Sequence, residues 1–150
     1  MAQGDLTLFN ELSTDLLEKV HNLGVGDDDI KVMLIDNTTV ATAASSAVKA
    51  TFTEVTGGTY AAVSIGGANQ SVSNVSGSTY KYDSVLNPSW SQDGSGPTNI
   101  YQAVIFNETA TSDECIGFID MTTDGGTTPI SLQAGNVSIT WNASGIFTLG

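Results

Sequence analysis

The feature that most constrains the fold is a long series of short strand-like segments, which begins at residue 30 and continues to residue 149. Each segment is apolar or rich in Thr, and turn signals such as Gly57-Gly58 and Asp124-Gly125-Gly126 separate the segments. Branched residues favour strands, and Gly and Asn favour turns. The predicted strands are 30–36, 50–55, 59–65, 71–75, 79–84, 100–107, 115–121, 130–132, 137–141 and 146–149. Many short strands with Gly-rich turns predict a mainly β fold, an antiparallel β-sandwich or a partly closed barrel.

One segment near the N-terminus has helical spacing instead. Its apolar stripe consists of Leu8, Phe9, Leu12, Leu16, Val20 and Leu23. This spacing predicts one amphipathic helix over about residues 6–23, capped by Asp5 or Thr7 and ended by Gly24. We expect the stripe to pack on the protein's own sheet, and the alternative is a neighbouring subunit. A chain of 150 residues is the size of one domain, so we expect 1–150 to fold as a unit with a β-rich body over about 30–149.

The charge balance excludes two classes of partner. Sixteen Asp and Glu face four Lys and no Arg, which gives a net charge of −12. A nucleic-acid interface or an anionic membrane surface needs a basic face, so we expect neither partner. No window approaches 18 apolar residues, and Met1–Asp5 does not have the form of a signal peptide. We therefore expect neither a membrane span nor export by the general secretory route.

Residue types that carry catalysis are scarce. The chain has one His and one Cys, too few for a zinc site, and it has no Gly-x-Ser-x-Gly elbow and no phosphate-binding loop. The spacing places His21 in the last turn of the predicted helix, where it suits the helix dipole, and we assign it no further role. Cys115 begins an apolar strand, which predicts a buried free thiol. We expect the protein not to be an enzyme and to need no cofactor.

Two other kinds of site stay open at this point. The acidic loops 27–29 and 120–125 could offer oxygen ligands to calcium, but neither has the spacing of a helix–loop–helix site, and solvated turns are favoured. A glycoside-hydrolase cleft would need two acids between aromatic walls. The aromatic residues that could line it are Trp90, Trp141, Tyr80, Tyr82 and Tyr101, but nothing connects them to an acid pair.

The last third of the chain carries a resemblance. Residues 101–107 read YQAVIFN, residues 116–120 read IGFID, and residues 138–149 read SITWNASGIFTL. The sequence resembles a group of small tailed-bacteriophage virion proteins that end in a Trp-x-x-x-Gly-Ile-Phe-x-Leu-like strand pair. Members of that group also place a helix ahead of a Lys-Val-x-Leu strand, here Lys31–Leu34, whereas residues 38–98 are only loosely similar.

The resemblance implies a structural component of the virion. The first hypothesis is a capsid decoration or cement protein on the exterior of the mature head, assembled in the host cytoplasm. Its partners would be the major capsid protein and copies of itself, often as trimers. The alternative is a tail or head-fibre component that binds a host surface or glycan. We expect docking through the N-terminal segment and the loop 87–99, with Met1, Ala2, Gln3, Gly4, Asp5, Trp90 and Pro97 as candidate interface residues.

Overall fold

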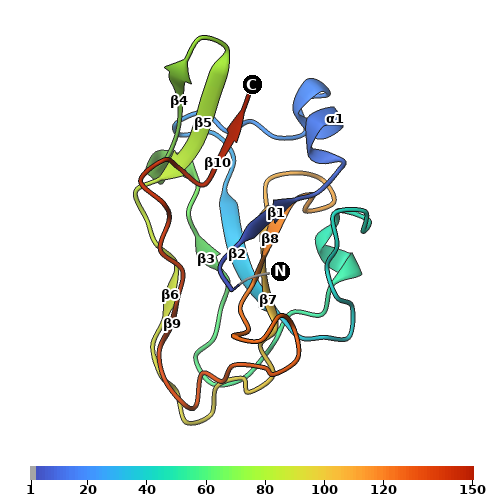
Figure 1. Cartoon of the computed structure of the whole chain (residues 1–150), viewed down its shortest axis with the longest axis vertical. Helices are drawn as coiled ribbons and strands as arrows, with labels where there is room; N and C mark the ends of the chain where they lie inside the picture. Colours follow the sequence, from blue (N-terminus) through green and yellow to red (C-terminus); the bar gives the residue numbers. More distant parts are fainter. Residues whose placement is uncertain (1–2) are drawn as a thin grey trace.

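The computed structural model describes residues 3–150 and consists of antiparallel sheets with one helix near the N-terminus (Figure 1). The central sheet has the order β1 (Leu6–Leu8), β8 (Cys115–Asp120), β7 (Gln102–Asn107), β2 (Ile30–Ile35), β3 (Val63–Ser64). A second sheet has the order β10 (Phe147–Leu149), β5 (Thr79–Ser84), β4 (Gln70–Ser76), and a third pairs β6 (Ser89–Trp90) with β9 (Val137–Ser138). The remaining elements are α1 (Leu12–Leu17) and the 3₁₀ turns η1 (Lys49–Thr51) and η2 (Gly67–Asn69). The predicted mainly β, antiparallel class is confirmed, and the fold is sandwich-like rather than a closed barrel.

The central strands are buried on both faces. In β2, Ile30, Val32 and Leu34 belong to one hydrophobic cluster, while Met33 and Ile35 belong to another. Strands β7 and β8 are buried over their whole length. Because both faces need apolar side chains, these strands read as continuous apolar runs rather than alternating ones. This explains why the sequence identified them with accurate boundaries.

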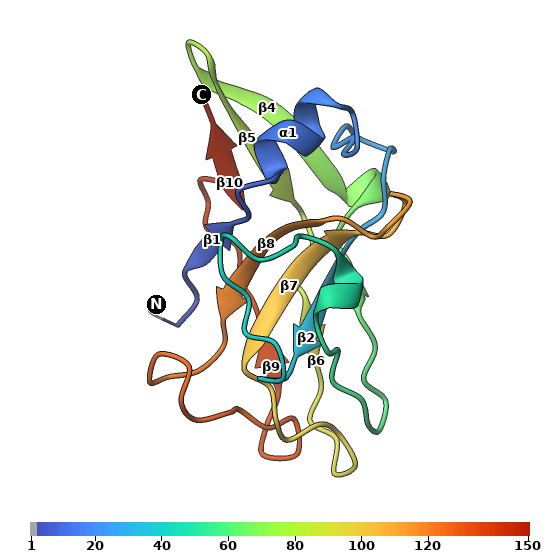
Figure 2. The ribbon, with the colours of Figure 1, turned by 90° about the vertical axis from the view of Figure 1, so that its right-hand side faces the viewer.

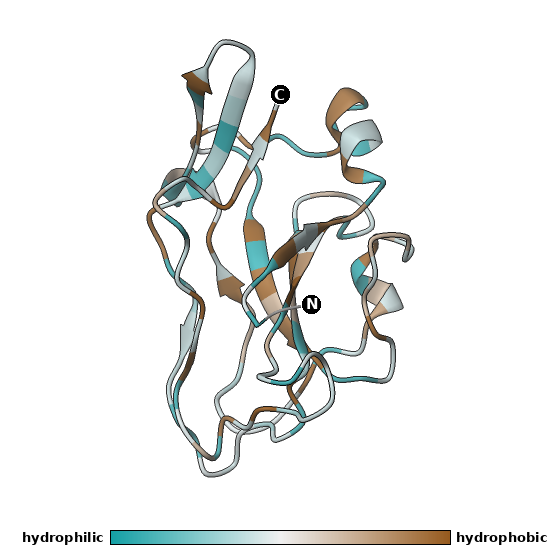
Figure 3. Cartoon of the chain, in the orientation of Figure 1, coloured by the Kyte–Doolittle hydropathy of each residue, from teal (hydrophilic) through white to brown (hydrophobic). Residues whose placement is uncertain are grey.

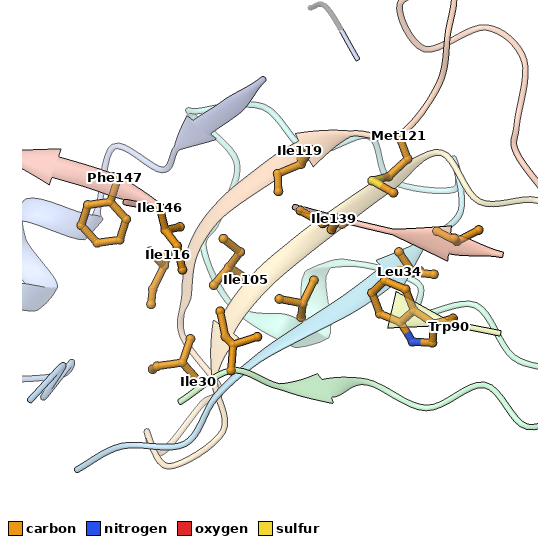
Figure 4. Close-up of a cluster of buried hydrophobic side chains, with 14 of the residues drawn as sticks. Ile30, Leu34, Trp90, Ile105, Ile116, Ile119, Met121, Ile139, Ile146 and Phe147 are labelled. Carbon is orange, nitrogen blue, oxygen red and sulfur yellow. The ribbon is translucent and has the colours of Figure 1, made fainter. Parts of the chain in front are cut away.

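Different elements cover the two faces of the central sheet. On one face, isoleucine and leucine side chains meet Trp90 and Phe147 from the other two sheets, together with Ile139 and Ile146, which directly follow β9 and precede β10 (Figure 4). On the opposite face, the segment between β2 and β3 crosses the strands (Figure 2) and contributes Phe52, beside Phe9 from the N-terminal segment. The rings of Phe9 and Phe118 lie 5.3 Å apart there. The sheet is therefore the middle layer of the molecule.

The predicted helix 6–23 is wrong in extent. Leu6–Leu8 forms strand β1, which pairs with Ile119–Gly117 at the edge of the central sheet. Gly117 makes this approach possible, because a Cβ there would meet the Thr7 carbonyl oxygen at 2.9 Å. The helix begins only at Leu12, with Glu11 as N-cap and without the predicted cap from Asp5 or Thr7.

The helix also ends earlier than its apolar stripe predicts. Lys19 has a left-handed φ of 61°. Its N–H donates to the Leu16 carbonyl at 3.3 Å, and the Val20 N–H donates to the Asp15 carbonyl at 2.8 Å. This pair of bonds is a Schellman motif, with Lys19 at the left-handed position that Gly usually occupies. Because a lysine stands there, the sequence does not indicate that the helix ends at this point. Leu12 and Leu23 are buried in the protein's own core, although only Leu12 lies in the helix.

Some predicted strands are turns or single bridges. Residues 50–55 contain the end of η1 and one bridge between Glu54 and Ile35. Residues 130–132 contribute one bridge, between Ile130 and Ile100, and only Val63–Ser64 of 59–65 is a strand. Burial of Phe52 and Leu132 in the core fixes these segments, and packing overrides their strand propensity. Within residues 3–150, no helix is long and apolar enough to cross a membrane.

Candidate docking surface

The N-terminal candidates lie at the edge of the central sheet. Met1 and Ala2 are outside the described residues. Gln3, Gly4 and Asp5 are exposed. The Gln3 side chain donates to the Met121 carbonyl at 3.0 Å, and the Gly4 N–H donates to the Asp120 carbonyl at 2.9 Å. These bonds hold the segment along the end of β8 and leave its three residues on the surface, so their role as interface residues stays a prediction.

The other two candidates are inside the protein, which corrects their assignment to a surface. Trp90 is 6% exposed, stacks on Tyr60 with ring centroids 6.3 Å apart, and donates from Nε1 to the Ala61 carbonyl at 2.8 Å. Pro97 is buried, and its carbonyl accepts the Leu132 N–H at 2.8 Å.

The loop 87–99 as a whole is tied down by long-range bonds that have no sequence signature. The Asp93 carboxylate accepts bonds from the backbone and hydroxyl of Thr59 and from the Ser95 N–H. The bonds from Ser95 and Thr59 lower the pKa of Asp93. Strand β6, inside the predicted loop, pairs with β9. The loop is therefore not a free docking segment.

An apolar groove lies between helix α1 and the sheet of β10, β5 and β4. It has a volume of about 330 Å³. Figure 3 shows hydrophobic segments on α1, β4 and β10, the elements around it. The apolar side chains that line the groove are Leu16, Leu23, Val72, Tyr80, Tyr82, Phe147 and Leu149.

Strand register explains why the groove is apolar. Val72 and Phe147 flank Tyr82 in the register. Tyr82 and Phe147 belong to the core, with Tyr82 2% exposed and its ring 5.2 Å from that of Phe147, whereas Val72 on the outer strand is 48% exposed. The next row on the same face contains Tyr80 beside Leu149, which are 50% and 37% exposed. Because every second side chain of a strand points to the same face, Tyr80 and Leu149 extend the apolar face of Tyr82 and Phe147 beyond the core. There the face is only partly covered by the described chain.

The groove is also nearly free of charge. Lys81 is its only charged lining residue, and the Lys81 Nζ lies 3.1 Å from Asp83 Oδ2. In a chain with 16 carboxylates, an apolar partner in this groove would therefore meet no unpaired charge. The sequence carried a signal for it, the i, i+2 pairs Tyr80/Tyr82 and Phe147/Leu149, but only the register shows that the two pairs share a face.

The single histidine is buried, which corrects its predicted place in the last helical turn. His21 lies beyond the end of α1 and is 4% exposed. Its Nδ1 is 3.2 Å from Asn107 Nδ2, while its Nε2 is 3.8 Å from Asp15 Oδ2, too far for a hydrogen bond. Since the Asn107 amide donates, Nδ1 is the acceptor and the proton resides on Nε2 in the neutral ring. Burial lowers the pKa of His21, although Glu114 and Asp28 oppose this effect.

We predict a pH dependence of stability from His21. Its pKa is about 6.5 when unfolded and lower when folded, so the unfolded chain binds the proton first as pH falls. The free energy of unfolding should fall as pH drops below 6.5, by up to about 1.4 kcal/mol per pH unit. Urea titrations at about pH 7.5 and 5.5 should show this loss in the wild type and a smaller loss in His21→Gln. Equal losses in both proteins would contradict the assignment.

The thiol and the histidine are both out of reach of a substrate. Cys115 is buried as predicted, and burial raises the pKa of its thiol. A buried protonated thiol is a poor nucleophile. Neither side chain can contact a bound molecule in this conformation.

Four of the five carboxylates in the two acidic loops accept hydrogen bonds from neighbouring parts of the chain. Asp28 accepts bonds from the Asn22 backbone and the Asn107 amide, and Asp29 accepts one from Ser64. In the other loop, Asp120 accepts from Thr122, while the Asp124 carboxylate caps the following turn. Within residues 3–150, no three His, Cys, Asp or Glu side chains gather where they could hold a metal ion.

The aromatic residues do not form one cleft. Trp90 and Trp141 border separate hollows, and Tyr80 and Tyr82 line the apolar groove. Trp141 donates from Nε1 to the Leu86 carbonyl at 2.7 Å. Comparison of the chain with models of known families, with curated proteins and with solved structures finds no match.

Proposed function

We propose that the protein is a non-enzymatic structural component of a bacteriophage virion, a decoration protein that binds the outer surface of the mature head. The observation that carries this proposal is the apolar groove between α1 and the sheet β10–β5–β4, in a chain of net charge −12. The resemblance of residues 101–107, 116–120 and 138–149 to small virion proteins supports the same class.

The groove suits an apolar segment of the shell protein. Its lining is apolar apart from Asn22, Gly24 and the paired Lys81. An acidic surface around an uncharged contact keeps free copies apart in solution and leaves apolar area to bind the shell. Attachment of this kind should survive about 0.5 M salt, because screening acts on charge pairs and not on apolar burial.

A substitution inside the groove tests this contact. Leu149→Asp places a carboxylate in the groove, in the last strand, at a side chain that is already 37% exposed. We expect the variant to keep its far-UV circular dichroism and to lose at least about tenfold in affinity for purified mature heads, which corresponds to about 1.4 kcal/mol. Cosedimentation with heads from which the protein has been stripped measures the affinity.

The matched control is Val40→Asp. Val40 is 57% exposed and precedes Ala41, which packs on the opposite face of the central sheet, so the same change of charge occurs far from the groove. Its binding should equal that of the wild type. Equal loss in both variants would mean that net charge controls attachment, and full binding by Leu149→Asp would place the contact elsewhere.

Copy number distinguishes the alternative. A head decorator occurs in many copies across the shell lattice, whereas a tail or head-fibre component occurs in few. Quantitative mass spectrometry of purified particles, with the major capsid protein as internal standard, gives the ratio. A low ratio would favour the tail or fibre assignment.

A further inference from the structure

Strand β4 is an open sheet edge. It pairs with β5 on one side, and the last five of its seven residues are exposed. No backbone hydrogen bond joins Ser71–Ser76 to any described segment other than β5. A strand in this position presents a row of free N–H and C=O groups that another strand can pair with.

The edge lacks most of the features that prevent pairing. Proteins blunt open edges with charges, Pro, bulges or short length. The other outer strands are β1, β3, β6, β9 and β10, and they have two or three residues each. Strand β4 has seven residues, with no charge and no Pro, and its single register shift lies between Asn74 and Ser76. The stretch Gln70–Asn74 is therefore a regular and unprotected edge.

The distribution of charge indicates which partner can pair with the β4 edge. Two copies of a chain with net charge −12 repel each other, so they can meet only where carboxylates are absent. Between Gly66 and Tyr82 the only charged residue is Lys81. A basic partner would find no carboxylate to pair with in this segment, and a second copy of the same chain would meet no carboxylate in it either.

We propose that two copies of the protein pair antiparallel through β4, with Val72 of one copy opposite Val72 of the other. This register uses the regular stretch before the bulge and places Gln70 opposite Asn74 and Ser71 opposite Ser73. All of these pairs are uncharged, and the central one is apolar. The pairing is self-complementary, as a two-fold interface requires. It does not depend on the proposed virion role.

The pairing has a geometric consequence for the groove. Residues opposite each other in an antiparallel sheet point to the same face, so the two-fold axis is perpendicular to the sheet. Both copies then present helix α1 and the apolar groove on the same side. The contact involves five residues of each strand, far fewer than the roughly 20–30 per side of a standard interface, so the dimer is weak and depends on concentration. Added salt should strengthen it by screening the net charge.

Disulfide trapping tests the register. Val72→Cys introduces one accessible thiol, because Cys115 is buried. Directly opposite Cα atoms in an antiparallel sheet lie about 4.5–5.5 Å apart, within the range that a disulfide spans. Under mild oxidation at high micromolar concentration, we expect a cross-linked dimer from Val72→Cys and little from Val40→Cys, whose site is similarly exposed at 57% against 48%. Equal cross-linking of the two variants, or none of Val72→Cys, would overturn the proposal.

A charge variant tests the association without a covalent bond. Val72→Asp would place two carboxylates opposite each other across the interface, whereas Val40→Asp adds the same charge elsewhere. Analytical ultracentrifugation should show at least tenfold weaker dimerisation for Val72→Asp and an unchanged constant for Val40→Asp. A concentration-dependent trimer, or a dimer insensitive to Val72→Asp, would contradict pairing through β4. Failure of head binding in the groove variant would leave these outcomes unaffected.

Discussion

Replacing Leu12 with aspartate should unfold the protein, whereas the same change at Leu16 should leave it folded. Leu12 is 2% exposed and belongs to the main core, between α1 and the central sheet. Truncation of a buried leucine costs about 2–5 kcal/mol, and a buried unpaired carboxylate adds to this cost. The sum is comparable with the whole stability of a domain, about 5–15 kcal/mol.

Leu16 provides the matched comparison four residues later. It is only partly buried and lines the apolar groove, so water can reach a carboxylate there. Circular dichroism and urea unfolding should show a disordered Leu12→Asp protein and a folded Leu16→Asp protein with impaired head binding. A folded Leu12→Asp protein would mean that the helix does not anchor the core.

Gly66→Ala should destabilise the protein by about 3 kcal/mol, although the backbone there is extended, with φ −93°. A Cβ at this position would collide with the Ile30 nitrogen and lie 2.8 Å from the Asp28 carbonyl oxygen. Both contacts are backbone atoms that cannot turn away. The same backbone holds β2 through bonds from Ile65 and Gly66 to the Ile30 carbonyl, at 2.7 and 2.9 Å.

Gly135→Ala is the control for the glycine prediction. A Cβ at Gly135 has nothing within 4 Å. Its free energy of unfolding should stay within about 0.5 kcal/mol of the wild type in urea titrations. If Gly66→Ala behaved like this control, the close approach of η2 to the start of β2 would be wrong.

The sequence predicted the strands that are defined by burial. Residues 100–107 and 115–121 each differ from β7 and β8 by one or two residues, because long apolar runs need both faces covered. Residues 79–84 match β5, which is only partly buried and which its Thr and Tyr residues favour as a strand. The helix was harder, since Lys19 ends it in a conformation that favours Gly, and Leu6–Leu8 finds a partner strand more than a hundred residues away. Local spacing cannot report such a partner.

The candidate site was the least predictable part. Trp90 and Pro97 looked like interface residues because their segment is rich in turn signals, yet long-range bonds to Ala61 and Leu132 bury it. The groove depends on the register between β5 and β10, which lie more than sixty residues apart in sequence. His21 was placed by helix period, but its environment is set by Asn107 on β7.

A reconstruction of the particle that carries this chain tests the central claim most directly. We expect density for the protein in many copies on the outer surface of the mature head, with α1 and the sheet β10–β5–β4 facing the major capsid protein. Side-chain density of the shell protein should fill the groove beside Tyr80 and Leu149. Density for the chain at the tail alone, or a decorating chain whose groove faces solvent, would contradict the account.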